Sequence, residues 1–192
     1  MEKSKRLDPR VLRTRRLLRD AFVECLEEMD LEKITVNRIA ERATINRVTF
    51  YLHYRDIPDM LEKMADEMMA EMKQILKSSP KRESHTEDGT PVMIDLLEHM
   101  AEHAKFYKLI LGTKRIPIFA ERLMMLLAEL MNEKLEREGS DSFIVKAGIQ
   151  KDIALWYGAS AIIGTIVSWL RNDMPYTPLF LSKQLSLLIP FR

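Results

Sequence analysis

The sequence predicts an all-α protein with a small helix-turn-helix head and a larger helical body. Only 6 of its 192 residues are glycine, which disfavours a turn-rich β protein. Its heavy use of Leu, Met, Ala, Glu and Lys favours helix. Apolar residues also recur at helical spacing along most of the chain. Hydrophobic residues at 46% and charged residues at 31% are typical of a soluble globular protein.

Residues 35–55 hold two short predicted helices. Thr35 can cap the first, because its hydroxyl can accept a hydrogen bond from an orphaned backbone N–H. Asn46 can cap the second in the same way. The intervening residues 44–46 interrupt the apolar pattern. Two short helices joined by a three-residue turn form a helix-turn-helix, whose second helix enters the major groove of DNA.

The second of these helices is expected to turn Ile45, Val48 and Leu52 inward and its polar side chains outward. An outward arginine can bond guanine edges or phosphates, and a threonine can meet a thymine methyl group. A buried helical hairpin is the alternative, but it has no need of outward Arg, Thr, Tyr and His together. The outward residues are Arg47, Thr49, Tyr51 and His53.

The segment A-E-R-A-T-I-N-R-V-T-F-Y-L-H-Y resembles the DNA-binding signature of the tetracycline-repressor (TetR) family of bacterial regulators. The likeness covers about residues 10 to 62 and is specific, although Thr44 and Val48 replace two usual glycines and Ile57 replaces a usual phosphate-contacting lysine. We expect base-edge contacts by Asn46, Arg47 and Thr49 and backbone contacts by Thr35, Tyr51 and His53. The complete predicted DNA-binding set is Thr35, Arg38, Asn46, Arg47, Thr49, Tyr51 and His53.

Charge is distributed unevenly along the chain. Residues 1–55 hold 13 Lys and Arg against 9 Asp and Glu, whereas residues 56–192 hold 17 against 20. A basic N-terminal part beside an acidic remainder suits a DNA-binding head, residues 1–55, on an effector-binding and dimerisation body, residues 56–192. Chance asymmetry is the open alternative.

Cysteine usage and the N-terminal sequence bear on the compartment. A basic helix from about residue 9 to 29 should bury the only cysteine, Cys25, so an internal disulfide is excluded. No apolar stretch follows the N-terminal charges, so no signal peptide is expected. Both features fit a cytoplasmic protein that joins the nucleoid when it binds DNA.

The body is expected to contain a connecting helix from residue 56 and a polar linker over residues 78–90. Further helices are predicted at about 91–111, 117–138, 149–172 and 178–189, with a short element near 141–147. Whether the linker is ordered stays open.

Residues 153–170 carry no charge and reach the lower length limit of a membrane span. A stripe of small residues at 4-3-4-3 spacing instead favours close helix packing, and a helix that is apolar all round is usually buried. The TetR resemblance implies a dimer interface built by the last two long helices. The residues expected there are Ala154, Gly158, Ala161, Thr165, Leu181, Leu185 and Leu188.

Methionine is abundant in the body, and it adapts to irregular surfaces and so suits a forgiving pocket. The resemblance implies a small-molecule effector there, although ordinary core packing explains the same residues. The expected lining residues are Met100, His103, Tyr107, Met124, Leu127 and Trp156.

His99-Met-Ala-Glu102-His103 matches the H-x-x-E-H motif of one zinc-peptidase class. Nothing in the sequence marks the further carboxylate ligand that a peptidase needs, so we expect no catalytic residue, no metal, no cofactor and no enzymatic activity. A regulatory metal at the two histidines remains an alternative.

The sequence therefore predicts a homodimeric regulator that binds a pseudo-palindromic operator in double-stranded DNA. It is expected to be a repressor released by a small-molecule effector, with no membrane partner. The alternatives are a helical protein-interaction module and a co-activator acting with a protein partner, as in the Firmicute subgroup that the body resembles.

Overall fold

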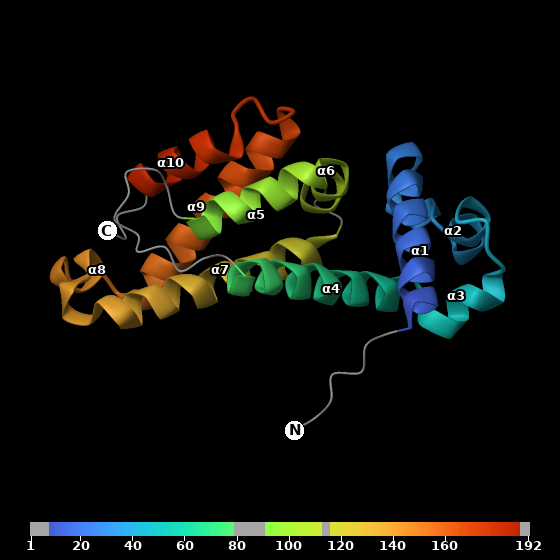
Figure 1. Cartoon of the computed structure of the whole chain (residues 1–192), viewed down its shortest axis with the longest axis horizontal. Coiled ribbons are helices and arrows are strands. Elements are labelled where there is room, and N and C mark those ends of the chain that lie inside the picture. The colour runs from blue at the N-terminus through green and yellow to red at the C-terminus, as the bar shows by residue number, and fades with distance from the viewer. Residues whose placement is uncertain (1–7, 79–90, 113–115, 189–192) are drawn as a thin grey trace, which may run out of the picture. The chain divides into compact units, whose positions relative to one another are not determined.

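A computed structural model describes residues 8–78, 91–112 and 116–188 of the chain. Figure 1 shows that these residues lie mostly in helices, and no strand occurs among them. The predicted all-α class is confirmed. The chain divides into two compact units, residues 1–64 and 65–192.

The first unit is a three-helix head followed by the start of a fourth helix. It contains α1 (Pro9–Glu28), a short 3₁₀ turn (Leu31–Lys33), α2 (Val36–Arg42) and α3 (Arg47–His53). The next helix, α4 (Ile57–Ser78), begins in this unit and ends in the second. The helix α2 packs against both α1 and α3.

The core of the head is apolar and aromatic, with Leu18, Phe22, Ile39 and Phe50 fully buried. Cys25 is also buried, as predicted, and burial raises the pKa of its thiol. A raised pKa leaves little thiolate at neutral pH, so this cysteine is a packing residue with low reactivity.

The described residues of the second unit form the later turns of α4 and six further α-helices. These are α5 (Pro91–Glu102), α6 (Ala104–Gly112), α7 (Pro117–Glu138), α8 (Phe143–Lys146), α9 (Lys151–Arg171) and α10 (Pro178–Leu188), with a 3₁₀ turn at Gly139–Asp141. The helix α9 packs against α6 and α7, and α10 packs against α5.

Ion pairs attach the later part of α4 to its neighbours in this unit. Asp66 lies 3.4 Å from Arg122 of α7, and Lys73 lies 3.1 Å from Glu129 of the same helix. Because these pairs are largely exposed, each contributes little by itself, at most about 1 kcal/mol.

The single helix expected over 91–111 is wrong, because the chain breaks at His103 into α5 and α6. Hydrogen bonds still cross the break: His103 N donates to His99 O at 3.2 Å, and Tyr107 N donates to His103 O at 3.1 Å. The chain therefore bends here without losing its backbone bonds. Apart from Ser78, which ends α4, the predicted linker lies outside the described residues.

Among the described residues, α9 is the helix long and apolar enough to cross a membrane by length and composition. Its inner face is covered by the rest of the second unit, where Ala159, Ile162, Ile166 and Trp169 are buried. This burial is typical of the core helix of a globular domain.

Candidate nucleic-acid interface

Side-chain caps define the two helices of the candidate site. Thr35 Oγ1 accepts a hydrogen bond from Arg38 N at 3.3 Å and begins α2. Asn46 Oδ1 accepts from Val48 N at 2.8 Å and begins α3. Both predicted caps are confirmed, and each satisfies a backbone N–H that the helix itself leaves unpaired.

The turn between the helices follows the Schellman pattern. Ile45 N donates to Ala40 O and Thr44 N donates to Glu41 O, each at 3.0 Å. Thr44 occupies the left-handed position of this motif with φ 55°, where glycine is most common. A β-branched residue is strained there, because its Cβ crowds the backbone.

We therefore expect Thr44→Gly to raise the free energy of unfolding of the head. Relief of the left-handed strain gives about 1–2 kcal/mol. The greater freedom of glycine in the unfolded chain takes back about 0.4–1 kcal/mol, leaving a net gain of roughly 0.5–1 kcal/mol. Urea denaturation followed by circular dichroism measures this gain.

The matched control is Thr49→Gly within α3, which should destabilise by roughly 0.3–0.5 kcal/mol because glycine is a poorer helix former than threonine. A loss of stability in Thr44→Gly as well would contradict the strain at the turn.

A bidentate ion pair joins α2 to α1. Arg42 Nη1 donates to Glu28 Oε1 at 2.7 Å, and Arg42 Nη2 donates to the other carboxylate oxygen. Hydrogen bonding to Arg42 lowers the pKa of Glu28, and the carboxylate in turn raises the pKa of Arg42. Arg42 is thus engaged within the head, where it joins α2 to α1.

The inward face predicted for α3 is wrong. Val48 is 65% exposed and Leu52 is 78% exposed, while Ile45 is half-buried. The residues that α3 buries are Phe50 and, just beyond its end, Tyr54, whose ring centroids lie 5.5 Å apart. Two large aromatic rings bury more apolar area than Val and Leu, and they fix the rotation of this short helix.

The predicted DNA-binding residues all lie on the head, but they differ in exposure. Arg47 and Tyr51 are exposed, and the guanidinium carbon of Arg47 lies 5.4 Å from the Tyr51 ring centroid. Thr49 and His53 are half-buried. Burial, aided by the charges of Arg15 and Lys63, lowers the pKa of His53, so this imidazole is neutral at pH 7. The remaining exposed members are Thr35, Arg38 and Asn46.

A polar cluster that the sequence reading missed fixes the end of α3 to the start of α4. Lys63 Nζ donates to the backbone O of His53 at 3.0 Å and lies 2.9 Å from Asp59 Oδ2. The same Asp59 oxygen accepts from Arg55 N at 2.9 Å. The i, i+4 spacing of Arg55, Asp59 and Lys63 is the signal that could have revealed this cluster.

Acid should weaken the head through Asp59. The hydrogen bonds from Arg55 N and Lys63 lower the pKa of this carboxyl below its usual value. The Asp59 carboxyl therefore binds a proton more tightly in the unfolded chain than in the folded chain. Its contribution to stability is fully present above the pKa of the unfolded state and is lost as the pH falls through the lower pKa of the folded state. Thermal unfolding of wild type and Asp59→Asn between pH 7 and pH 3 measures this effect.

We expect the Asp59→Asn variant to melt at a lower temperature at pH 7 and to lose less stability than wild type on acidification. Asp20→Asn, at an exposed position on α1, is the control and should follow wild type. Identical pH profiles for wild type and Asp59→Asn would contradict the role of the cluster.

The residues predicted for the dimer interface do not share one face. Ala154, Gly158, Leu181 and Leu185 are buried within the chain itself, Thr165 is half-buried, and only Ala161 and Leu188 are exposed. The buried face of α9 lies against α6 and α7. The stripe of small residues predicted for the dimer interface lies partly on this buried face, about one residue away along the helix from the outward face. Most of the predicted set thus packs inside the chain, and a second copy can meet only the outward residues. The outward face of α9 carries Ile153, Trp156, Tyr157, Ser160, Ala161, Gly164 and Ser168.

The residues predicted for an effector pocket differ in burial. Met100, Tyr107 and Leu127 are buried, while His103, Met124 and Trp156 are exposed. Trp156, at 64% exposure, belongs to the outward face of α9. The effector pocket stays a prediction, and the buried residues Met100, Tyr107 and Leu127 are the best candidates for its lining.

Comparison with known proteins places this architecture among transcriptional regulators. The TetR-type family described as "Transcriptional regulator C-terminal region" matches residues 87–190. The uncharacterized HTH-type transcriptional regulator YxbF of Bacillus subtilis (strain 168) is 36% identical over 104 residues, which cover 52% of this chain. The chain spans only 27% of the length of that relative.

Two further proteins resemble nearly the whole chain. The fatty acid metabolism regulator protein of Bacillus subtilis is 23% identical over 178 residues, covering 85% of this chain and 87% of the relative. The crystal structure of a transcriptional regulator FadR from Bacillus subtilis in complex with stearoyl-CoA has a TM-score of 0.64 at 20% identity, covering 91% of this chain and 97% of that one. At this identity the structural likeness shows the fold alone.

Proposed function

The chain belongs to the TetR family of transcriptional regulators, and we propose that it is a homodimeric repressor that reads a pseudo-palindromic operator with α3 and releases it when an effector binds the body. TetR-type regulators are DNA-binding proteins, not enzymes. Repression, the operator and the effector are proposals for this chain.

The observation that carries the proposal is the exposed surface at the N-terminal end of α3. Arg47 offers a guanidinium that can bond guanine edges or phosphates, and Asn46 beside it can bond adenine. The exposed Val48 and Leu52, unexpected for a helix that only packs in a core, suit apolar contact with thymine methyl groups. The fixed cap at Asn46 and the anchored end at His53 hold these side chains in a defined orientation.

A dimer supplies the second head that a pseudo-palindrome needs. The outward face of α9 repeats at 153, 157, 160, 164 and 168, and small residues occupy its last three positions. Small residues allow two helices to approach closely, and the exposed Ile153, Trp156 and Tyr157 supply apolar area to bury. Two heads on one dimer would meet half-sites about 10 base pairs apart on one face of the duplex.

We propose an apolar effector, bound in the second unit near Met100, Tyr107 and Leu127. Support comes from the burial of these residues and from the relative named a fatty acid metabolism regulator protein. Because one similar structure is a complex with stearoyl-CoA, long-chain acyl-CoA is the first class to test.

An acyl-CoA that binds the folded body should raise its melting temperature. A ligand at 100 times its dissociation constant stabilises by about 2.7 kcal/mol, which corresponds to several degrees for a chain of this size. Stearoyl-CoA should produce this shift, whereas free CoA, which lacks the apolar chain, should not. Equal shifts with both compounds would exclude an apolar acyl site.

Selection of bound sequences from random duplex DNA tests the DNA-binding proposal. Purified full-length protein should enrich an inverted repeat with two half-sites. Failure to enrich any sequence at low salt would contradict the DNA-binding proposal and favour the alternative function, a helical protein-interaction module. The co-activator alternative is not favoured by the comparisons.

The proposed place of action is the cytoplasm, with the dimer on the nucleoid when it is bound to DNA. This follows from the function, because the operator is there.

A further inference from the structure

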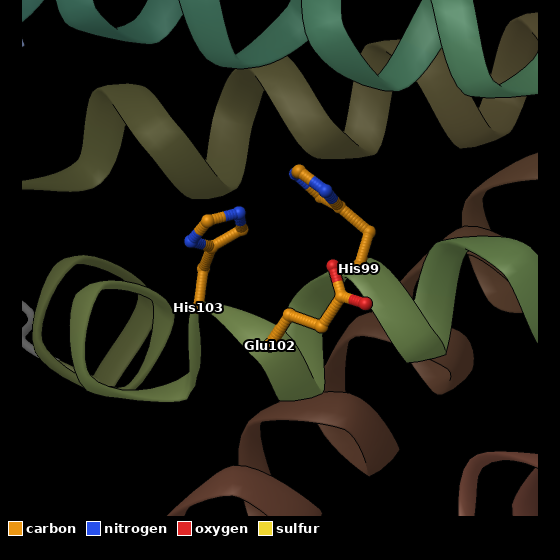
Figure 2. A group of neighbouring side chains, drawn as sticks. All are labelled: His99, Glu102 and His103. Carbon is orange, nitrogen blue, oxygen red and sulfur yellow. The ribbon is translucent and has the colours of Figure 1, made fainter.

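Two histidines and two carboxylates meet where α5 gives way to α6. His99, Glu102 and His103 each offer one ligand atom, and these three atoms lie within 4.8 Å of one another. The imidazole centroids of His99 and His103 are 4.8 Å apart. Figure 2 shows both rings on the same side of the chain, with the Glu102 carboxylate turned back toward His99.

A fourth potential ligand comes from a different helix. Glu71 of α4 places Oε2 3.8 Å from His99 Nε2. All four residues belong to the second unit, so the cluster lies within one compact body. The spacing of His99, Glu102 and His103 creates the cluster, because residues three and four apart are neighbours on a helical turn and His103 N still donates to His99 O at 3.2 Å.

We infer that His99, Glu102, His103 and Glu71 form a binding site for a divalent transition-metal ion of the Zn²⁺ type. Two imidazoles with one or two carboxylates are a donor set that Zn²⁺ accepts. Zinc–nitrogen bonds of about 2.0–2.1 Å place tetrahedral ligand atoms roughly 3.3–3.5 Å apart. The separations here, up to 4.8 Å, exceed that by at most roughly 1.5 Å, and the exposed side chains of His103 and Glu102 can rotate to close the difference.

The surroundings of His99 favour a metal ligand over a solvated surface group. Its side chain is only 14% exposed. The buried Tyr107 ring packs against it edge-on with a centroid distance of 5.8 Å. A ligand held in place by packing loses less conformational freedom when it binds.

An ion pair between His99 and Glu71 alone is the simpler arrangement of these groups. It accounts for the 3.8 Å contact but gives no role to His103, whose ring lies against that of His99. A shared cation accounts for the convergence of both rings and of Glu102. It would also join α4 to the α5–α6 junction.

Titration of untagged, chelator-treated full-length protein with Zn²⁺ by calorimetry at pH 7.5 tests the inference. One ion per chain should bind with a dissociation constant in the micromolar range or tighter. Replacement of the ion by Co²⁺ should give the visible absorption bands of a cobalt ion in a protein site with nitrogen ligands. Both readouts are independent of DNA binding, so the failure of the proposed regulator function would not affect them.

Three variants locate the site. His103→Ala and Glu71→Gln should each weaken Zn²⁺ binding at least about tenfold, because even the outer partners of metal ligands contribute 10–100-fold. Glu98→Gln, an exposed carboxylate on the same helix α5, is the matched control and should bind like wild type. Both ligand positions are exposed, and circular dichroism verifies that each variant folds.

Absence of stoichiometric binding, or the same affinity in wild type and His103→Ala, would overturn the site. Unchanged affinity in Glu71→Gln would overturn the four-residue set.

Discussion

Replacing Arg47 by alanine should abolish most of the sequence-specific affinity for the operator. Arg47 is exposed on the first turn of α3, and its position over the Tyr51 ring orders the guanidinium before DNA arrives. A bidentate contact to guanine contributes about 1–3 kcal/mol of discrimination at each half-site, and a symmetric dimer makes this contact twice. We therefore expect a loss of roughly 2–6 kcal/mol for the full operator.

Fluorescence anisotropy with the selected operator and with a scrambled duplex measures this loss. Arg137→Ala, which removes the same charge from α7 in the second unit, is the matched control and should bind like wild type. Both variants should retain the helical circular dichroism spectrum, because Arg47 is exposed. Wild-type operator affinity in Arg47→Ala would show that α3 does not read DNA through this residue.

Gly164→Arg should separate the dimer into monomers. Gly164 lies on the outward face of α9, and among the described residues no heavy atom outside its chain neighbours and the adjacent helix backbone lies within 4 Å of a Cβ added there. The monomer therefore has room for the new side chain and gains helix propensity. In a dimer packed through this face, the arginine would be overpacked and its charge buried without a partner, at a cost of about 3–5 kcal/mol.

Sedimentation equilibrium, with concentrations around the wild-type dissociation constant, measures the change. A cost of about 3–5 kcal/mol weakens dimerisation by roughly 10²–10⁴-fold, and operator affinity should fall with it. Ala70→Arg, at an exposed position within α4, is the matched control and should remain dimeric. An intact Gly164→Arg dimer would move the interface away from this face of α9.

Local chemistry made much of the fold predictable. Pro9 and Pro117 begin α1 and α7 as expected, since proline suits a first helical position, and Thr35 and Asn46 cap α2 and α3. The helix-turn-helix motif also predicted which helix should bind DNA, because the exposed polar residues of α3 are close together in the sequence.

The predictions failed where tertiary packing decides which face is buried. The helix α3 has only seven residues and carries apolar side chains on all sides, so its spacing does not distinguish Val48 and Leu52 from Phe50. The helix α9 has small residues on two neighbouring faces, and only contact with α6 and α7 selects the buried one. The bend at His103 leaves no proline or glycine signal, so one helix was expected where two occur.

The central claim is that two copies of α3 on one dimer read two half-sites. It is tested most directly by the affinity of wild-type protein for its selected operator and for the same operator with five base pairs inserted at the centre. Five base pairs are about half a helical turn, so the insertion places the half-sites on opposite faces of the duplex. We predict that the inserted operator binds at least 100-fold more weakly, and equal affinity for the two duplexes would contradict the account.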